Sequence, residues 1–329
     1  MPDFIEHLHI TNFKSISSCE ITDCKRINLF IGRPNVGKSN ILEALSLFSI
    51  PFLRENPSKK LSNLIRVENE AELFYNGDYH NQKQAFIESS KGFCKLSYHP
   101  KLGLDLFINF PNASCIYTID ANFNVKAPKY PIVDSPIKRY TFNPGVTYKK
   151  AHAKYLIPPF GYNLFSILES YEDLKREVRM LFKEYDLDIA FDKSSQTIKV
   201  IQSTAKDDIF LIPYNSIADT LQRIIFYKSA IASNSNSVLL FEEPEAHSFP
   251  PYMAHLTQEM IGKKDDQFFV ATHSPFILND LLENGREELA VFMVRYENHE
   301  TKVRRLSDEE LHAVFQNGVD LFTNSESFV

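Results

Sequence analysis

The sequence predicts an α/β fold built on a parallel sheet. Three segments lead to this prediction: a strand, glycine-rich loop and helix within residues 27–50, an apolar strand that ends in acids at residues 242–243, and an apolar strand that ends in Thr-His at residues 272–273. Strands that alternate with helices are typical of a sheet with helices on its faces. Because parallel strands end at the same edge, we expect these polar end residues to lie close together.

The composition is that of a folded protein. The chain has 329 residues, enough for a sizeable core, and 43% are hydrophobic. Its net charge of −6 argues against a surface coated with positive charge for nucleic acid, although a local basic patch is compatible with it. The N-terminal segment lacks the features of a signal peptide, and no apolar run approaches the ~20 residues of a membrane span. The four cysteines form no CxxC pair, so we expect a cytoplasmic protein without zinc or disulfides.

The first elements are predicted from their periodicity. Residues 4–16 alternate as an early strand, and residues 26–32 form a more buried strand. Residues 38–50 have the apolar spacing of a helix. Aromatic and turn residues from about 61 to 133 indicate a β-meander.

The second half predicts helices and two strands. Residues 163–185 are amphipathic and form one helix or a broken pair. Helices are also predicted for residues 217–233 and 252–263. VLLF at 238–241 and QFFVAT at 267–272 are buried strands, of which the latter is the last clear one.

We predict a single head over residues 1–329. Its core comes from residues 1–60 and 205–300, and residues 61–204 form an insertion. The insertion is predicted to be β-rich over 61–160 and helical over 161–190, and a C-terminal segment covers 301–329.

A glycine-rich loop lies between the second strand and the first helix. Residues 32–39 read GRPNVGKS and match G-x-x-x-x-G-K-[ST] in its strand–loop–helix context. The glycines let backbone N–H groups converge on phosphate oxygens, and the helix N-terminus adds partial positive charge. We expect Lys38 to reach the β- and γ-phosphates of ATP and Ser39 to bind Mg²⁺. The candidate nucleotide-binding residues here are Gly32, Arg33, Pro34, Asn35, Val36, Gly37, Lys38, Ser39 and Asn40.

Two acids, Glu242 and Glu243, follow the strand VLLF. In P-loop proteins a second apolar strand ends in an acid near Mg²⁺. Glu242 stands at that position and is expected to hold the metal directly or through a water. Glu243 is the candidate general base, which orients or deprotonates the attacking water.

The strand QFFVAT brings Thr272 and His273 to the same sheet edge. We predict that His273 contacts the γ-phosphate or the attacking water. Together with Lys38 and Glu243, it completes the set of candidate catalytic residues.

These motifs together resemble the ABC-type ATPases of the SMC/RecF class, and more closely the OLD-like (overcoming-lysogenisation-defect) ATPases, a group rich in bacterial anti-phage systems. The matching stretches are ITNFKSI at 10–16, GRPNVGKSN at 32–40, LLFEEPEAH at 239–247 and ATHSPFIL at 271–278. The resemblance implies a P-loop ATPase head of the ABC type with a parallel or mixed sheet, plus an inserted β-meander and a helical lobe. It implies ATP and Mg²⁺ as cofactors, Glu242 as the Walker B acid, Glu243 as the base and His273 as the switch histidine.

The resemblance also implies a homodimer or a higher homo-oligomer, in which two heads enclose two ATPs and each lends a signature loop to the other. The equivalent stretch here, NSIADTLQR at 215–223, lacks the glycine of the family pattern. In one interpretation Ser216 keeps the serine role and binds nucleotide. In the other, Ser216 or Asp219 caps the following helix.

Full-length OLD nucleases continue into a TOPRIM domain, whereas only 56 residues follow His273 here and they contain no DxD. We therefore expect any nuclease or toxin effector to be a separate protein acting in trans. The C-terminal stretch at 315–329 either docks a partner or packs on the chain's own core. Its apolar residues are Phe315, Val319, Leu321, Phe322 and Phe328.

Residues 126–155 are basic and aromatic, a composition that suits nucleic acid, although a solvated loop is the alternative. The basic residues are Lys126, Lys129, Lys138, Arg139, Lys149, Lys150 and Lys154. The interleaved aromatic residues are Tyr130, Tyr140, Phe142, Tyr148 and Tyr155.

Three functions are compatible with these features. The first is a Mg²⁺-dependent ATPase that drives or gates an anti-phage or nucleic-acid process, such as a DNA-repair-type head. The second is a slow ATPase scaffold that restrains a partner protein. The third, a small-molecule kinase, is the weakest because no acceptor site is evident.

Overall fold

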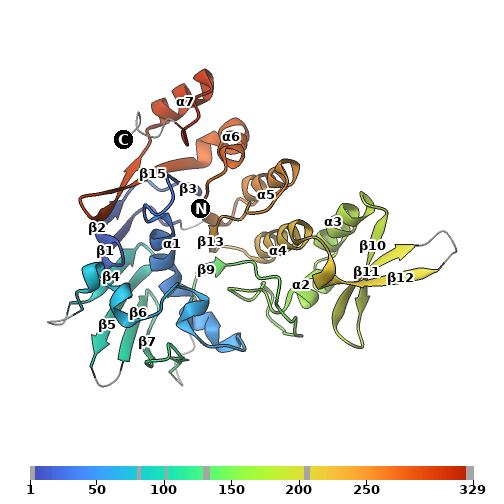
Figure 1. Ribbon diagram of the computed structural model, residues 1–329, viewed down its shortest axis with the longest axis horizontal. Coiled ribbons are helices and arrows are strands. Elements are labelled where there is room, and N and C mark those ends of the chain that lie inside the picture. The colour runs from blue at the N-terminus through green and yellow to red at the C-terminus, as the bar shows by residue number, and fades with distance from the viewer. Residues whose placement is uncertain (1–3, 80–82, 101–102, 129–133, 204–207, 324–329) are drawn as a thin grey trace. The chain divides into compact units, whose positions relative to one another are not determined.

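A six-stranded sheet forms the centre of the fold, and its strand order is β16-β15-β3-β14-β13-β9. In the computed structural model, which describes residues 4–79, 83–100, 103–128, 134–203 and 208–323, strands β3, β13, β14 and β15 run parallel while β16 is antiparallel to β15. The bounds are β3 Ile27–Ile31, β9 Ile137–Tyr140, β13 Val238–Glu242, β14 Gln267–Ala271, β15 Leu289–Glu297 and β16 Glu300–Arg305. The predicted α/β fold with a mixed sheet is confirmed (Figure 1).

Buried apolar runs explain the central strands. All five residues of β3 and of β14 are buried, as expected for a parallel sheet covered on both faces. The prediction that residues 267–272 form the last buried strand is wrong, because β15 begins with six buried residues. Charged residues flank that apolar run at Glu287, Glu288 and Arg295, which obscures it in a short sequence window.

Helix α1 (Lys38–Ser46) follows the glycine-rich loop and contacts β13 and β14. The predicted helix extends to residue 50, but from Leu47 to Glu55 the chain is a 3-10 helix. Pro51 lies inside that segment and has no N–H to continue an α-helical ladder.

A seven-stranded antiparallel sheet carries the predicted β-meander, in the order β2-β1-β4-β5-β6-β7-β8. The prediction is wrong for residues 61–77, where the chain has no strand and short 3-10 segments cover Leu61–Asn63, Glu70–Leu73 and Tyr75–Gly77. Asn63, Asn69, Asn76 and Gly77 recur along that stretch, and such residues favour turns over strands. The bounds are β1 Leu8–Phe13, β2 Ile16–Ile21, β4 Ala85–Ser89, β5 Gly92–His99, β6 Gly103–Phe110, β7 Ala113–Ile119 and β8 Val125–Lys126.

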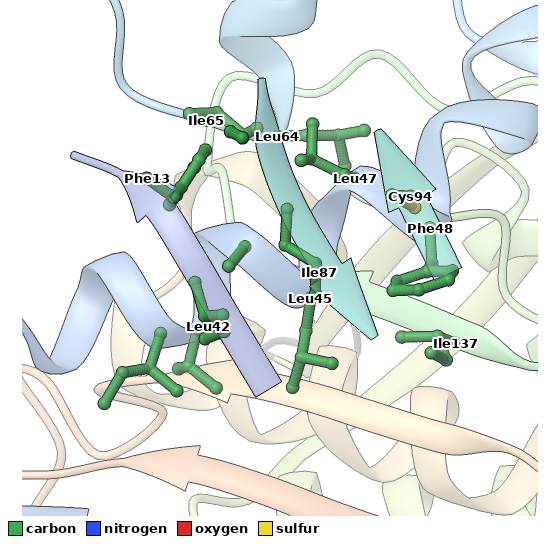
Figure 2. Close-up of a cluster of buried hydrophobic side chains, with 14 of the residues drawn as sticks. Phe13, Leu42, Leu45, Leu47, Phe48, Leu64, Ile65, Ile87, Cys94 and Ile137 are labelled. Carbon is green, nitrogen blue, oxygen red and sulfur yellow. The ribbon is translucent and has the colours of Figure 1, made fainter. Parts of the chain in front are cut away.

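The core of this part of the chain is one cluster of apolar side chains from α1, the 3-10 segments and both sheets. Figure 2 shows Leu42 and Leu45 of α1 in the same cluster as Phe13 of β1 and Ile87 of β4. Each of these four side chains is fully buried. This packing fixes the helix that follows the glycine-rich loop against the strands that end beside it.

Two units follow from the chain's internal contacts. Unit 1 comprises Met1–Arg139, Asn236–Glu243 and Lys264–Val329, and unit 2 comprises Tyr140–Ser235 and Pro244–Lys263. Unit 1 also contains α6 (Pro275–Asn284) and α7 (Asp308–Asn317).

The described residues of unit 2 contain the α-helices α2 to α5 and a small sheet in the order β10-β11-β12. Of the two forms predicted for residues 163–185, the broken pair is correct, with the break at Tyr171 between α2 and α3. Lys228 of α4 pairs with Glu177 of α3 and Glu259 of α5, so one buried amine joins three helices. The bounds are α2 Leu164–Ser170, α3 Glu172–Lys183, α4 Asp219–Ser233, α5 Pro250–Gly262, β10 Leu187–Asp192, β11 Thr197–Ser203 and β12 Ile209–Pro213.

None of the helices within the described ranges is long and apolar enough to span a bilayer.

Candidate functional site

The glycine-rich loop is closely surrounded by backbone and side chains. Gly32 has φ 151°, and a Cβ there would lie 2.2 Å from the Val294 carbonyl oxygen. Gly37 has φ 102°, and a Cβ there would lie 2.0 Å from Thr301 Oγ1. Both the backbone conformation and the space therefore require glycine. The loop keeps the curled shape that a phosphate-binding loop needs.

The segment before the loop helps to fix it. Ser15, from the ITNFKSI stretch, lies 2.6 Å from Thr301 Oγ1 and accepts a hydrogen bond of 2.6 Å from Asn40 Nδ2. Thr301 also donates to the Val36 carbonyl oxygen over 3.0 Å. Asn40 and Val36 are therefore structural members of the loop region, and sequence reasoning missed Ser15 and Thr301 as their partners.

Lys38 begins α1 and is buried. Its Nζ donates to the carbonyl oxygens of Gly32 and Arg33, each over 2.8 Å. Burial lowers the pKa of Lys38 to about 8, although Glu243 and Glu242 act in the opposite direction. The amine is thus held against its own loop and has the charge, when protonated, to contact an incoming phosphate.

Glu242 and Glu243 lie at the carboxyl end of β13, as predicted. The Glu243 N–H donates to the Ala271 carbonyl oxygen over 2.8 Å, which ties it to the end of β14. Glu243 has φ 42°, a left-handed conformation that is uncommon for a residue other than glycine and is enriched at functional sites. Its side chain is exposed, whereas Glu242 is more enclosed.

Glu242 is held by two arginines that sequence analysis did not assign to the site. Arg66 Nη2 donates to Glu242 Oε1 over 3.1 Å, and Arg139 Nη2 donates to Glu242 Oε2. The Ser39 hydroxyl also hydrogen-bonds to this carboxylate. Burial raises the pKa of Glu242, but Arg139, Ser39 and Arg66 together outweigh it, so that the pKa lies below its ordinary value. Glu242 is therefore ionised and close to Ser39.

His273 follows the end of β14, and its Nε2 lies 3.5 Å from Glu243 Oε1. Burial and the charge of Lys38 lower the pKa of His273, and Glu243 raises it less. The chain then turns into α6, because Ser274 caps the helix by accepting from the Ile277 N–H and Pro275 occupies its first turn. This cap fixes the position of His273 between the end of β14 and the start of α6.

The structure thus brings together five of the residues predicted from sequence, all in unit 1. Charge effects on their pKa values, a hydrogen bond of Ser39 to Glu242 and the approach of His273 to Glu243 link Lys38, Ser39, Glu242, Glu243 and His273. They come from three separate segments of the chain. The hydroxyl and carboxylate oxygens of Ser39 and Glu242 suit Mg²⁺, and the glycine loop, helix N-terminus and Lys38 suit the phosphates of a nucleotide. The residues present therefore fit ATP and Mg²⁺.

Ser216 lies in a short 3-10 turn of unit 2, Tyr214–Ser216, before α4. Ala218 is the residue at the helix N-cap, and no side chain caps the helix. The interpretation in which Ser216 or Asp219 caps α4 is therefore wrong. Asp219 is instead the first residue of the helix, where its negative charge is favourable.

The basic stretch at 126–155 does not form one exposed surface. Lys138 and Arg139 are buried in β9, where Lys138 donates to Ser237 and Arg139 pairs with Glu242. Lys129 and Tyr130 lie outside the described residues. Among the described residues of the stretch 126–155, the exposed lysines are Lys126, Lys149, Lys150 and Lys154.

Charge reversal of Lys149 and Lys150 tests whether these exposed residues contact nucleic acid. If they do, Lys149→Glu with Lys150→Glu should weaken DNA or RNA binding and reduce its salt dependence, because fewer counterions are released. Fluorescence anisotropy over a salt series measures both quantities. Absence of binding by the wild-type protein at low salt would exclude this role.

The described part of the C-terminal stretch is mostly exposed or half-buried. Leu321 is buried, whereas Phe315 of α7 is exposed and lies 5.7 Å from the Arg286 guanidinium. Phe328 lies outside the described residues. Packing on the chain's own core is therefore correct for Leu321.

Comparisons with known proteins agree on the class of fold. The DNA replication and repair protein RecF of Porphyromonas gingivalis is 34% identical over 84 residues, which are 26% of this chain and 22% of that protein. The chain therefore spans about a fifth of the length of this curated relative. A solved Smc head bound to the C-winged helix domain of ScpA aligns with a TM-score of 0.55 and 14% identity, covering 93% of this chain and 99% of the other.

An Smc head with an extended coiled coil, bound to the C-terminal domain of ScpA derived from Pyrococcus furiosus, aligns with a TM-score of 0.53 and 14% identity over 95% of this chain and 99% of the other. At such identities the likeness establishes the fold alone. A family model described as "AAA domain, putative AbiEii toxin, Type IV TA system" matches residues 27–279, from β3 through the glycine-rich loop, β13 and β14. The chain accordingly belongs to this family of AAA domains and has the fold of an SMC/RecF-type ABC ATPase head.

Proposed function

We propose that the chain is a Mg²⁺-dependent ATPase whose nucleotide state controls a separate effector protein. The observation that carries this proposal is the convergence of Lys38, Ser39, Glu242, Glu243 and His273 beside the glycine-rich loop. A nucleotide-binding loop alone would fit many proteins, whereas the second carboxylate and the histidine supply groups for hydrolysis.

Each residue has a role that follows from its position. Lys38 would leave the carbonyls of Gly32 and Arg33 to contact the β- and γ-phosphates, and Ser39 and Glu242 would hold Mg²⁺ directly or through water. When bound there, Mg²⁺ would neutralise phosphate charge. The exposed Glu243 accepts a proton from the attacking water, and His273, 3.5 Å from it, orients that water or the γ-phosphate.

The proposed assembly is a homodimer or a higher homo-oligomer, with Ser216 of one head contacting nucleotide held by the other. The solved Smc heads that share this fold are bound to domains of ScpA. By analogy, we propose that a separate protein docks on this chain. The family description connects domains of this kind with a type IV toxin–antitoxin system. We propose that the chain acts in such a defence system and that the nuclease or toxin effector is the separate protein.

Two alternatives use the same site. A slow ATPase scaffold would bind ATP and restrain its partner without rapid turnover. A DNA-repair-type head, favoured by the RecF match, would be stimulated by DNA. Steady-state phosphate release, measured with and without DNA, RNA and the protein encoded by the neighbouring gene, separates the three functions. Stimulation by the neighbouring protein supports the gated ATPase, and stimulation by DNA supports the repair-type head. Slow turnover that responds to none of them supports the scaffold.

Purified alone, the chain should hydrolyse ATP slowly and leave plasmid DNA and RNA intact with Mg²⁺ or Mn²⁺, because its paired acids at the end of β13 are assigned to ATP. Gel analysis of both substrates after incubation measures this. Robust cleavage that is lost in an active-site variant of this same chain would show that the effector is not separate.

A further inference from the structure

A line of ion pairs runs from the ITNFKSI stretch to the end of β13. Lys14 Nζ pairs with Glu43 and donates to the Arg66 carbonyl oxygen over 2.6 Å. Arg66 Nε donates to Glu43 Oε1 over 2.9 Å, and its Nη2 reaches Glu242 Oε1 at 3.1 Å. Arg139 completes the line at Glu242 Oε2. All five residues belong to unit 1.

The two arginines on Glu242 are held very differently. The Arg139 side chain is 6% exposed, and its Nη1 also donates to the buried Ser46 hydroxyl over 3.2 Å. The Arg66 side chain is 69% exposed and has no such second support at its tip among the contacts of the described residues. An exposed ion pair contributes little and is exchanged easily, whereas a buried and hydrogen-bonded one is costly to break.

The base of the Arg66 side chain is nevertheless fixed. Glu43 is 1% exposed, receives Lys14 on one oxygen and Arg66 Nε on the other, and also accepts from the Arg66 N–H over 3.3 Å. The backbone and Nε of Arg66 are thus anchored, and only its distal Nη2 lies on Glu242. Release of that contact does not require the anchor to move.

Both oxygens of Glu242 are therefore occupied by guanidinium groups. A divalent cation beside Ser39 needs the negative charge of the Glu242 carboxylate, either directly or through a water. Each arginine that pairs with Glu242 weakens the attraction between this carboxylate and the cation. The contact of Arg66 with Glu242 Oε1 is the weaker of the two, so it is the one that can break when a cation binds.

We propose that Arg66 is a positioning residue that competes with Mg²⁺ for Glu242, while Arg139 holds the carboxylate in place throughout. This inference rests on the proposed function and deepens it. Arg66 keeps the carboxylate neutralised until Mg²⁺ and nucleotide enter together, and it then withdraws from Oε1.

The test measures the Mg²⁺ concentration at which binding of a non-hydrolysable ATP analogue is half-maximal, by titration calorimetry. Arg66→Gln should lower this concentration roughly fivefold, the size expected from loss of one exposed ion pair. Arg54→Gln is the matched control, because it removes the same charge from an arginine that pairs with Asp134 and Glu55 and not with Glu242. It should leave the value unchanged.

A merely structural role for Arg66 predicts the opposite sign, since a loosened site needs more Mg²⁺. An unchanged or higher Mg²⁺ requirement in Arg66→Gln, with a wild-type thermal unfolding midpoint, would overturn the inference while leaving the ATPase proposal intact. If the wild-type protein binds no analogue at any Mg²⁺ concentration, it is the proposed function itself that fails.

Discussion

Glu243→Gln is expected to slow ATP hydrolysis by roughly 10²-fold or more while ATP still binds, which is the usual scale for loss of a general base. Glutamine keeps the size of the side chain but cannot accept the proton of the attacking water. Because the Glu243 side chain is exposed and its backbone N–H donates to Ala271, the substitution should leave the end of β13 in place. Phosphate release at saturating ATP measures the rate, and calorimetry measures binding.

The matched control is Glu88→Gln, which removes the same charge from an exposed position on β4 of the same unit. It should hydrolyse ATP at the wild-type rate. Turnover by Glu243→Gln at the wild-type rate would show that the base is another group.

Lys38→Ala should abolish measurable ATP binding, because the phosphates lose their main charged side-chain partner. The Gly32 and Arg33 carbonyl oxygens that now accept from Lys38 also lose that donor, so the loop is expected to loosen as well. Titration calorimetry with ATP and Mg²⁺ measures the loss, and thermal unfolding verifies that the variant is folded.

Lys59→Ala removes the same charge from an exposed position of unit 1, and its backbone contact to Val125 is kept. Its ATP affinity should equal that of the wild type. Undiminished affinity for ATP in a folded Lys38→Ala protein would show that the glycine-rich loop is not the ATP-binding site.

The parts of the site that sequence predicted are those set by local pattern. Lys38 and Ser39 follow from the spacing of one loop, and Glu242 and His273 follow from the ends of apolar strands. Parallel pairing of β13, β14 and β3 then brings these segments to one edge. No knowledge of side-chain packing is needed for that step, which is why it succeeded.

The arginines could not be predicted in the same way. Arg66 meets Glu242 across 176 residues of sequence and Arg139 meets it across 103. Arg66 lies outside any regular element, and the composition around Arg139 predicts an exposed basic surface, although Arg139 is buried. One available signal was Glu43, a charged residue among the apolar residues of α1, since a buried acid requires a cation.

Lys138 illustrates the same limit. Composition places it with exposed basic residues, but the structure buries it in β9, and burial lowers its pKa to about 8, with Asp266 and Asp134 acting in the opposite direction. A charge count along the sequence does not distinguish a strand interior from a loop. The hypothesis of an exposed basic surface therefore depends on Lys149 and its neighbours and not on the whole stretch.

The most direct test of the central claim is phosphate release from ATP by the purified wild-type chain, measured with Mg²⁺, with the metal chelated, and in Lys38→Ala and Glu243→Gln. Release should be slow, require Mg²⁺, disappear in Lys38→Ala and fall roughly 10²-fold or more in Glu243→Gln. Release that is independent of Mg²⁺ and equal in all three proteins would contradict the central claim.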